Sequence, residues 1–150
     1  CHNIEGNQTN SELDGAGGPD FGEMDLLLAN NRFRGDVVSN GSGVAITQSF
    51  PGVAVGEEMR VALGWDTNTS YGLYATDPSD DLDLILKRPD GTVAAVSSSF
   101  DNTHEVIEFT ANQAGTWTIE VNRFRTSDPA GSTFAGLAWH KYAPSACTAP

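Results

Sequence analysis

Two short stretches of the sequence concentrate oxygen-bearing side chains that could bind a metal ion. The stretch DDLDLILK places Asp81 and Asp83 on one face, because side chains along a strand alternate with a period of two. The stretch FDNTHE adds Asp101, Asn102 and Glu105 in a predicted turn. Calcium takes about six to eight oxygen ligands from carboxylates, amides and carbonyls, so these residues could hold Ca²⁺. A solvated acidic loop that only aids solubility is the alternative, and the residues alone leave both open.

Other catalytic and metal chemistries find little support in the residues. His2, His104 and His140 are the only candidate bases for a serine or cysteine hydrolase, and none lies beside a nucleophile elbow. Zinc spacings such as C-x-x-C and H-E-x-x-H are absent. A glycosidase would need two carboxyls across an aromatic-lined cleft, whereas the three tryptophans alternate into predicted core faces. We therefore predict no catalytic residue in this chain.

The elements that must position these side chains are predicted to be short strands from Val37 onward. In EMRVALGW every second residue from Met59 to Trp65 is apolar, which is typical of a strand with one buried face. RPDG is a predicted turn, because Pro89 presets its first central position and Gly91 accepts a positive φ. The alternating faces predict a core of Trp65, Leu82, Leu84, Ile107, Phe109, Trp117, Ile119, Val121 and Trp139.

One short helix is expected before the strands. In DFGEMDLLLANNRFRG, Asp20 is the predicted N-cap, Met24, Leu27 and Leu28 have helical spacing, and Gly35 is the predicted stop. Seven or eight strands with turn signals and no helices between them favour an all-β fold, an antiparallel β-sandwich. We expect residues 1–36 to form an N-terminal loop and helix, and residues 37–150 to form the sandwich domain.

Charge and composition exclude several classes of partner. The net charge is −12, with 20 acidic and 8 basic residues, and no basic stripe that nucleic acid would need is present. No apolar run approaches the roughly 20 residues that span a bilayer. The chain starts at Cys1 without a signal-peptide pattern, so we interpret it as a fragment of a longer precursor. We expect a monomer that binds neither nucleic acid nor membrane.

Cys1 and Cys147 lie at the two ends of the chain and are its two cysteines. If they pair, the disulfide closes almost the whole chain into one loop and implies an oxidising, secreted setting. Two unrelated thiols are the alternative. We predict the disulfide.

The strand segments also carry a family resemblance. The elements D-L-D-L, P-x-G, D-N-x-x-E and G-T-(aromatic)-T-(I/V)-x-V follow one another in DDLDLILKRPDGTVAAVSSSFDNTHEVIEFTANQAGTWTIEVNRF. Together with GWDTNTS and FAGLAWHKY, this region resembles the C-terminal jelly-roll domain of secreted bacterial subtilisin-like serine peptidases, related to prepeptidase C-terminal domains. The upstream HNIEG and DGAGGPDFGEMDLLLANNRF are similar to the stretch that ends the peptidase domain of such proteins.

The resemblance implies a jelly roll, an extracellular location and a partner, the peptidase catalytic domain of the same precursor. It also implies contact with protein substrate, and Ca²⁺ bound by Asp81, Asp83, Asp101, Asn102 and Glu105. Residues 1–36 would then be the end of a peptidase domain. The segments that bear the catalytic Ser, Asp and His are missing, so we expect the chain to be no enzyme.

Two functions are therefore open. The domain could be a non-catalytic module that stabilises its peptidase, assists secretion or helps hold substrate. It could instead be a free-standing module that binds carbohydrate or a fibrous protein, because a β-sandwich does not determine function. Exposed coplanar Trp or Tyr rings would favour the second function and inward tryptophans the first. Tyr71 and Tyr74 are the aromatic pair that we expect to contact a ligand in that case.

Overall fold

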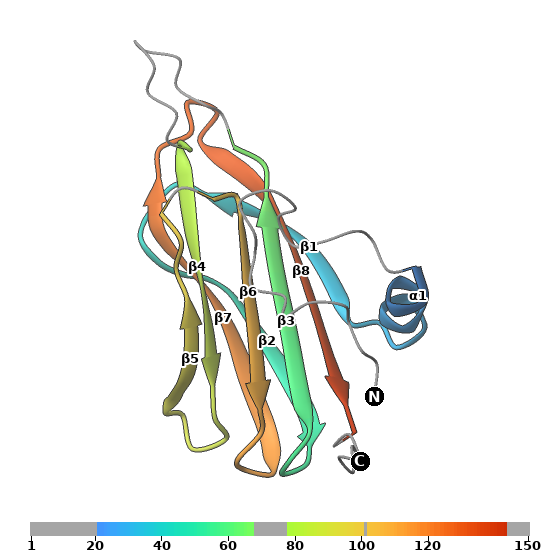
Figure 1. The fold of residues 1–150 in the computed structure, drawn as a ribbon. Helices are drawn as coiled ribbons and strands as arrows, with labels where there is room; N and C mark the ends of the chain where they lie inside the picture. The colour runs from blue at the N-terminus through green and yellow to red at the C-terminus, as the bar shows by residue number, and fades with distance from the viewer. Residues whose placement is uncertain (1–20, 68–77, 101, 144–150) are drawn as a thin grey trace.

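The described part of the protein is a β-sandwich of two four-stranded antiparallel sheets with one short helix at its side (Figure 1). The computed structural model describes residues 21–67, 78–100 and 102–143. Within these ranges the elements are α1 Phe21–Ala29, β1 Phe33–Ser39, β2 Gly43–Val53, β3 Glu58–Trp65, β4 Asp80–Lys87, β5 Val93–Ser97, β6 His104–Thr110, β7 Gly115–Thr126 and β8 Ser132–Tyr142. The predicted all-β sandwich with one N-terminal helix is confirmed.

The strand order identifies the sandwich as a jelly roll. One sheet has the order β1-β8-β3-β6 and the other β2-β7-β4-β5. The first strand pairs with the eighth, the second with the seventh, the third with the sixth and the fourth with the fifth, each pair antiparallel. This nesting is that of one long hairpin rolled over itself, which gives the jelly roll. As a result β4 and β6, which carry the two acidic stretches, begin at the same end of the sandwich (Figure 1).

The hydrophobic core lies between the two sheets and follows the predicted period-two faces. Of the nine residues predicted to be buried, eight are buried: Trp65, Leu82, Leu84, Ile107, Trp117, Ile119, Val121 and Trp139. Phe109 is half-buried, because β6 is an edge strand and leaves one side of the ring uncovered. The Phe109 ring still packs on Trp117, with 5.7 Å between the ring centroids.

The helix ends earlier than the sequence predicts. We expected Gly35 to stop it, but α1 ends at Ala29 and Asn31 adopts a positive φ of 51°. The N–H of Arg32 donates to Leu27 O at 2.9 Å and the N–H of Asn31 to Leu28 O at 3.1 Å, which is the Schellman pattern. Asn tolerates this left-handed conformation, so Asn31 ends the helix. The predicted N-cap, Asp20, lies outside the described residues.

Gly35 lies instead in β1, which begins at Phe33. The first strand of the sandwich therefore starts four residues before Val37, inside the segment predicted as loop and helix. A Cβ at Gly35 would come within 2.6 Å of the Phe134 ring, so the glycine allows that ring to lie across β1. The need for a small residue here comes from the packing of β8 against β1 and leaves no local pattern in the sequence.

The predicted RPDG turn joins β4 to β5 and has the expected geometry. The N–H of Gly91 donates to Arg88 O at 2.9 Å, and Gly91 has a φ of 84°. The Asp90 carboxylate accepts hydrogen bonds from the Thr92 N–H at 2.9 Å and from Gln113 Nε2 at 2.8 Å. These bonds to Gln113 and Thr92 lower the pKa of Asp90 from its usual 3.8 to about 2.

Acid should selectively weaken this turn. A carboxyl whose pKa is lowered on folding stabilises the protein fully above its unfolded pKa, and this stabilisation is lost as pH falls from about 4 to about 2. We therefore expect the melting temperature of Asp90→Asn to lie below that of the parent at pH 5 and to converge with it near pH 2. Thermal unfolding over this range measures the difference. A gap between the two proteins that stays constant down to pH 2 would contradict the assignment.

Cys1 and Cys147 lie outside the described residues, so their disulfide stays a prediction. Thiol titration of the unfolded, unreduced protein should find no free thiol, and reduction should release two. Two free thiols before reduction would show that the cysteines do not pair.

Candidate functional site at the acidic end of the sandwich

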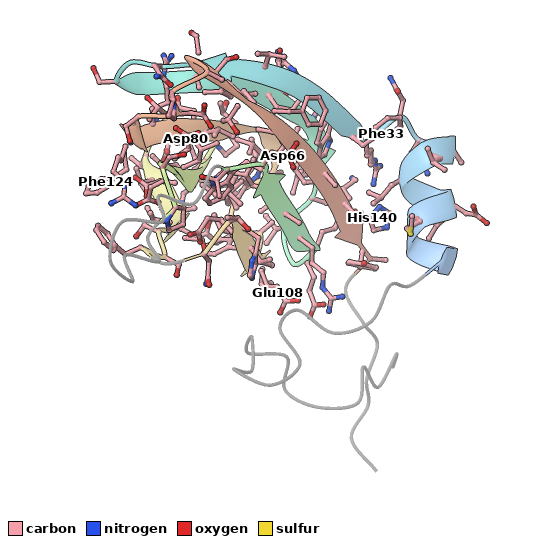
Figure 2. The ribbon with its side chains drawn as sticks, turned by 90° about the horizontal axis from the view of Figure 1, so that it is seen from above. Phe33, Asp66, Asp80, Glu108, Phe124 and His140 are labelled. Carbon is pink, nitrogen blue, oxygen red and sulfur yellow. The ribbon has the colours of Figure 1, made fainter. Side chains whose placement is uncertain are left out.

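The first residue of β4, Asp80, is fully buried and ties three parts of the fold together. Its Oδ1 accepts hydrogen bonds from the N–H groups of Ser127 at 3.0 Å and Asp128 at 3.3 Å, in the turn between β7 and β8. Its backbone oxygen accepts the indole N–H of Trp65 at 3.0 Å. Burial raises the pKa of Asp80, and the nearby Asp128 carboxylate raises it further. Asp80 is therefore a structural anchor at this end of the molecule (Figure 2).

Asp81 and Asp83 alternate with the core residues Leu82 and Leu84 along β4, as the period of two predicts. Asp81 is buried and lies opposite Arg125 on β7. Asp83 is half-buried and accepts a hydrogen bond from Asn122 Nδ2 at 3.3 Å. Both carboxylates thus point to the side of the sheet that faces away from the core.

The register next to Asp81 is irregular. Asp81 pairs with Arg125, whereas Leu82 pairs with Arg123, so Phe124 is an extra residue in β7. Such a bulge redirects the side chains around it. Phe124 is exposed and packs edge-on against Phe100, with ring centroids 6.2 Å apart. This bulge could not be predicted from the sequence, because the apolar alternation of β7 is regular up to Val121.

The second acidic stretch forms a hydrogen-bonded turn around Ser99. The buried Glu105 accepts hydrogen bonds from the Ser97 hydroxyl and, at 2.5 Å, from the Ser99 N–H. Asn102 donates its Nδ2 to the Ser99 hydroxyl at 2.9 Å. Glu105 lies two residues before the buried Ile107 and therefore on the same face of β6, so its side chain enters the sandwich. Asn102 lies in the turn before β6 and Glu105 is the second residue of that strand, so the prediction of one turn holds only for Asn102; Asp101, between β5 and β6, lies outside the described residues.

The donor types suit calcium, but the described residues by themselves do not complete a site for it. Over residues 21–67, 78–100 and 102–143, no group of three or more His, Cys, Asp or Glu residues is placed to hold a metal ion. Asp83 points away from the core, whereas Glu105 points into the sandwich. The two stretches share one end of the molecule, but Asp83 and Glu105 do not point to the same side of it. The calcium assignment, which includes Asp101, stays a prediction.

The three tryptophans are all buried, with exposed fractions of 6% for Trp65, 0% for Trp117 and 7% for Trp139. The indole N–H of Trp117 donates to Gln113 O at 3.1 Å. These rings fill the core and offer no platform to a ligand. Tyr71 and Tyr74 lie outside the described residues.

The geometry defines an eight-stranded jelly-roll domain with a buried acidic end. Residues 54–123 of this domain match the family of the bacterial pre-peptidase C-terminal domain, or PPC domain. The match runs from the residues just before β3 through most of β7, and it includes both acidic stretches. It confirms the resemblance to prepeptidase C-terminal domains. Domains of this family are C-terminal accessory domains of bacterial peptidases, and they occur in secreted enzymes.

Two further comparisons add little. No curated protein is similar enough to the chain to count as a match. Among the residues that the structure describes, no helix has the length and apolar character needed to cross a membrane.

Proposed function

We propose that this chain is a non-catalytic accessory domain of a secreted subtilisin-like serine peptidase, which stabilises the enzyme, assists its secretion or helps it bind protein substrate. The match of residues 54–123 to the PPC family carries the proposal, because that family is appended to peptidases. The jelly-roll topology supports it. The catalytic domain of the same polypeptide is then the main partner, and the domain works outside the cell.

We propose in addition that the domain binds Ca²⁺ through Asp81, Asp83, Asp101, Asn102 and Glu105. Hard oxygen donors of this kind suit calcium. The hydrogen bonds of Asn102 and Glu105 to the same residue, Ser99, and the start of β4 and β6 at one end of the sandwich, support the proposal. The opposite directions of Asp83 and Glu105 mean that a single ion would need ligands from beyond the described residues.

The alternative function, a free-standing module for carbohydrate or a fibrous protein, has less support. Aromatic platforms of such modules need exposed rings that stack on the ligand. Trp65, Trp117 and Trp139 all lie in the core, so the inward orientation that distinguishes the two functions favours the accessory domain.

The proposal is tested by expressing the peptidase polypeptide with and without this domain. We expect removal to lower the amount of secreted enzyme, to shorten its half-life on heating or to slow cleavage of protein substrates. Turnover of a small peptide substrate, which needs the catalytic domain alone, should stay the same. Trp117→Ala in the intact polypeptide is the matched control, because it disrupts the sandwich without shortening the chain. Equal secretion, heat inactivation and protein cleavage in all three proteins would refute the proposal.

A further inference from the structure

One side of the molecule exposes large apolar side chains from three elements. We call this surface the apolar corner; it consists of Met24, Leu26 and Leu28 of α1, Phe33 and Val37 of β1, and Phe134 of β8. Leu28 is 60% exposed, Val37 66% and Phe134 52%. Single exposed apolar residues are ordinary, but a contiguous group of this kind marks an interaction surface.

The register and packing show that the sandwich part of the corner is continuous. Val37 lies directly opposite Phe134 in the β1–β8 pair. The Phe134 ring lies across Gly35, where a Cβ would approach it to 2.6 Å. Phe33 lies two residues from Gly35 on the same face of β1, at the end of the strand next to α1 (Figure 2). The strip therefore runs from Val37 to the helix without interruption.

The helix is held in place beside this strip. The N–H of Trp139 donates to Arg32 O at 3.1 Å, and the Arg32 guanidinium contacts Nδ1 of His140 at 3.0 Å. Both contacts join the residues after α1 to β8. Yet of the leucines of α1, only Leu27 is half-buried, while Leu26 and Leu28 are exposed. A helix that is apolar on several sides is normally buried on several sides, so the described part of the chain leaves α1 incompletely covered.

The outward face of the sandwich part of the corner also lacks charge in a chain whose net charge is −12, whereas α1 carries the exposed Asp25. The outward positions of β1 are Phe33, Gly35, Val37 and Ser39. The charged residues of the strand, Arg34 and Asp36, alternate with them and form an ion pair with each other. β1 is an edge strand, so one side of it has no neighbour within the described sheet. An edge strand with an apolar outward face is a liability unless another surface covers it.

We propose that the apolar corner is the surface on which the peptidase catalytic domain of the same polypeptide docks, an inference that rests on the proposed function. A PPC domain is C-terminal to its peptidase. The catalytic domain is therefore joined on the N-terminal side, where α1 leads into β1 and where the corner lies. A tethered domain is held at high effective concentration near this point, so even a modest apolar surface is enough to keep it docked. The docked surface of the catalytic domain should be apolar and uncharged.

Hydroxyl-radical footprinting read by mass spectrometry tests the docking without any substitution. Phe33 and Phe134 report on the corner; Phe124 on β7 and Phe100 in the connection between β5 and β6 are similarly exposed and are internal controls. In the 150-residue chain all four should be oxidised at similar rates. In the polypeptide that includes the peptidase domain, oxidation of Phe33 and Phe134 should fall by at least about fivefold, because burial removes their contact with water. Phe100 and Phe124 should not change.

Equal oxidation of Phe33 and Phe134 in both proteins would overturn the inference. Protection of Phe33 and Phe134 that is already present in the 150-residue chain would overturn it too. If that protection depends on protein concentration, a second copy of the chain covers the corner. If it does not, other segments of the same chain cover it.

A second test compares Val37→Lys with its control, Val96→Lys on β5. Only Val37→Lys should speed heat inactivation of the attached peptidase, and equal effects of the two substitutions would contradict the docking. A failure of the proposed function would give a different result from a failure of the docking. Deleting the domain would then leave secretion, heat inactivation and protein cleavage unchanged, while Phe33 and Phe134 would still be protected.

Discussion

Replacing Trp117 with alanine is expected to lower the free energy of unfolding by about 3–5 kcal/mol. The side chain is 0% exposed near the start of β7, between the two sheets. It packs against Phe109, with 5.7 Å between the ring centroids, and its indole N–H donates to Gln113 O at 3.1 Å. The substitution removes the largest fully buried side chain of the described residues, leaves a cavity and leaves the Gln113 oxygen without this donor. Urea denaturation with a linear extrapolation measures the loss.

Thr116→Ala is the matched control, because Thr116 is the exposed neighbour of Trp117 on the same strand. A surface substitution of this kind should change stability by less than about 0.5 kcal/mol. Trp117→Phe should lie between the two, since it keeps a ring in the core but loses the indole N–H. A loss below about 1 kcal/mol for Trp117→Ala would mean that the assigned core face of β7 is wrong.

The faces of the strands could be predicted because a half-buried strand must alternate. From Met59 to Trp65 in β3, every second residue is apolar and buried. The RPDG turn was equally local, since Pro89 and Gly91 restrict the backbone by their own chemistry. Gly35 misled the prediction of the helix end for the opposite reason. Its role depends on the Phe134 ring, which comes from a strand almost one hundred residues away.

Asp80 shows a signal that was present but not used. By the period of two it belongs to the same face of β4 as Leu82 and Leu84, so the pattern placed a carboxylate in the core. A buried carboxylate needs hydrogen-bond donors, and the N–H groups of Ser127 and Asp128 provide them. The identity of those donors could not be read from the sequence, because the β7–β8 turn reaches Asp80 only through the jelly-roll pairing of β4 with β7.

The candidate metal site was less predictable than the fold. Spacing along one strand shows that Asp81 and Asp83 alternate with core residues, and that inference is local. The relation of β4 to β6 is not local, because these strands belong to different sheets. The packing of the two sheets determines the direction of Glu105 relative to Asp83. The residue types that could bind a metal ion could therefore be predicted, but whether they converge on one ion could not.

Calcium is expected to raise the melting temperature of the protein, and chelator should reverse the effect. An ion that binds only the folded state stabilises it by RT ln(1 + [L]/Kd), which is about 2.7 kcal/mol at a hundredfold excess over Kd. Binding should also relieve repulsion among the clustered carboxylates of a chain with a net charge of −12. Magnesium should give a smaller shift, because it prefers a tighter octahedron and keeps more of its water. Thermal unfolding of chelator-treated protein, with millimolar CaCl₂ or MgCl₂ at constant ionic strength, measures both shifts.

Two variants then separate a specific site from general screening of negative charge. Asp83→Ala removes a predicted ligand that is half-buried at the acidic end, whereas Glu58→Gln removes an exposed charge from β3 that no predicted site uses. Only Asp83→Ala should lose the calcium response, because screening would act on both charges alike. Asp101→Asn extends the test to the ligand that lies between the two described strands, and it should weaken the response in the same way. If stripped protein does not respond to millimolar calcium, or Asp83→Ala responds in full, then the carboxylates of β4 serve only to anchor turns and to keep the domain soluble.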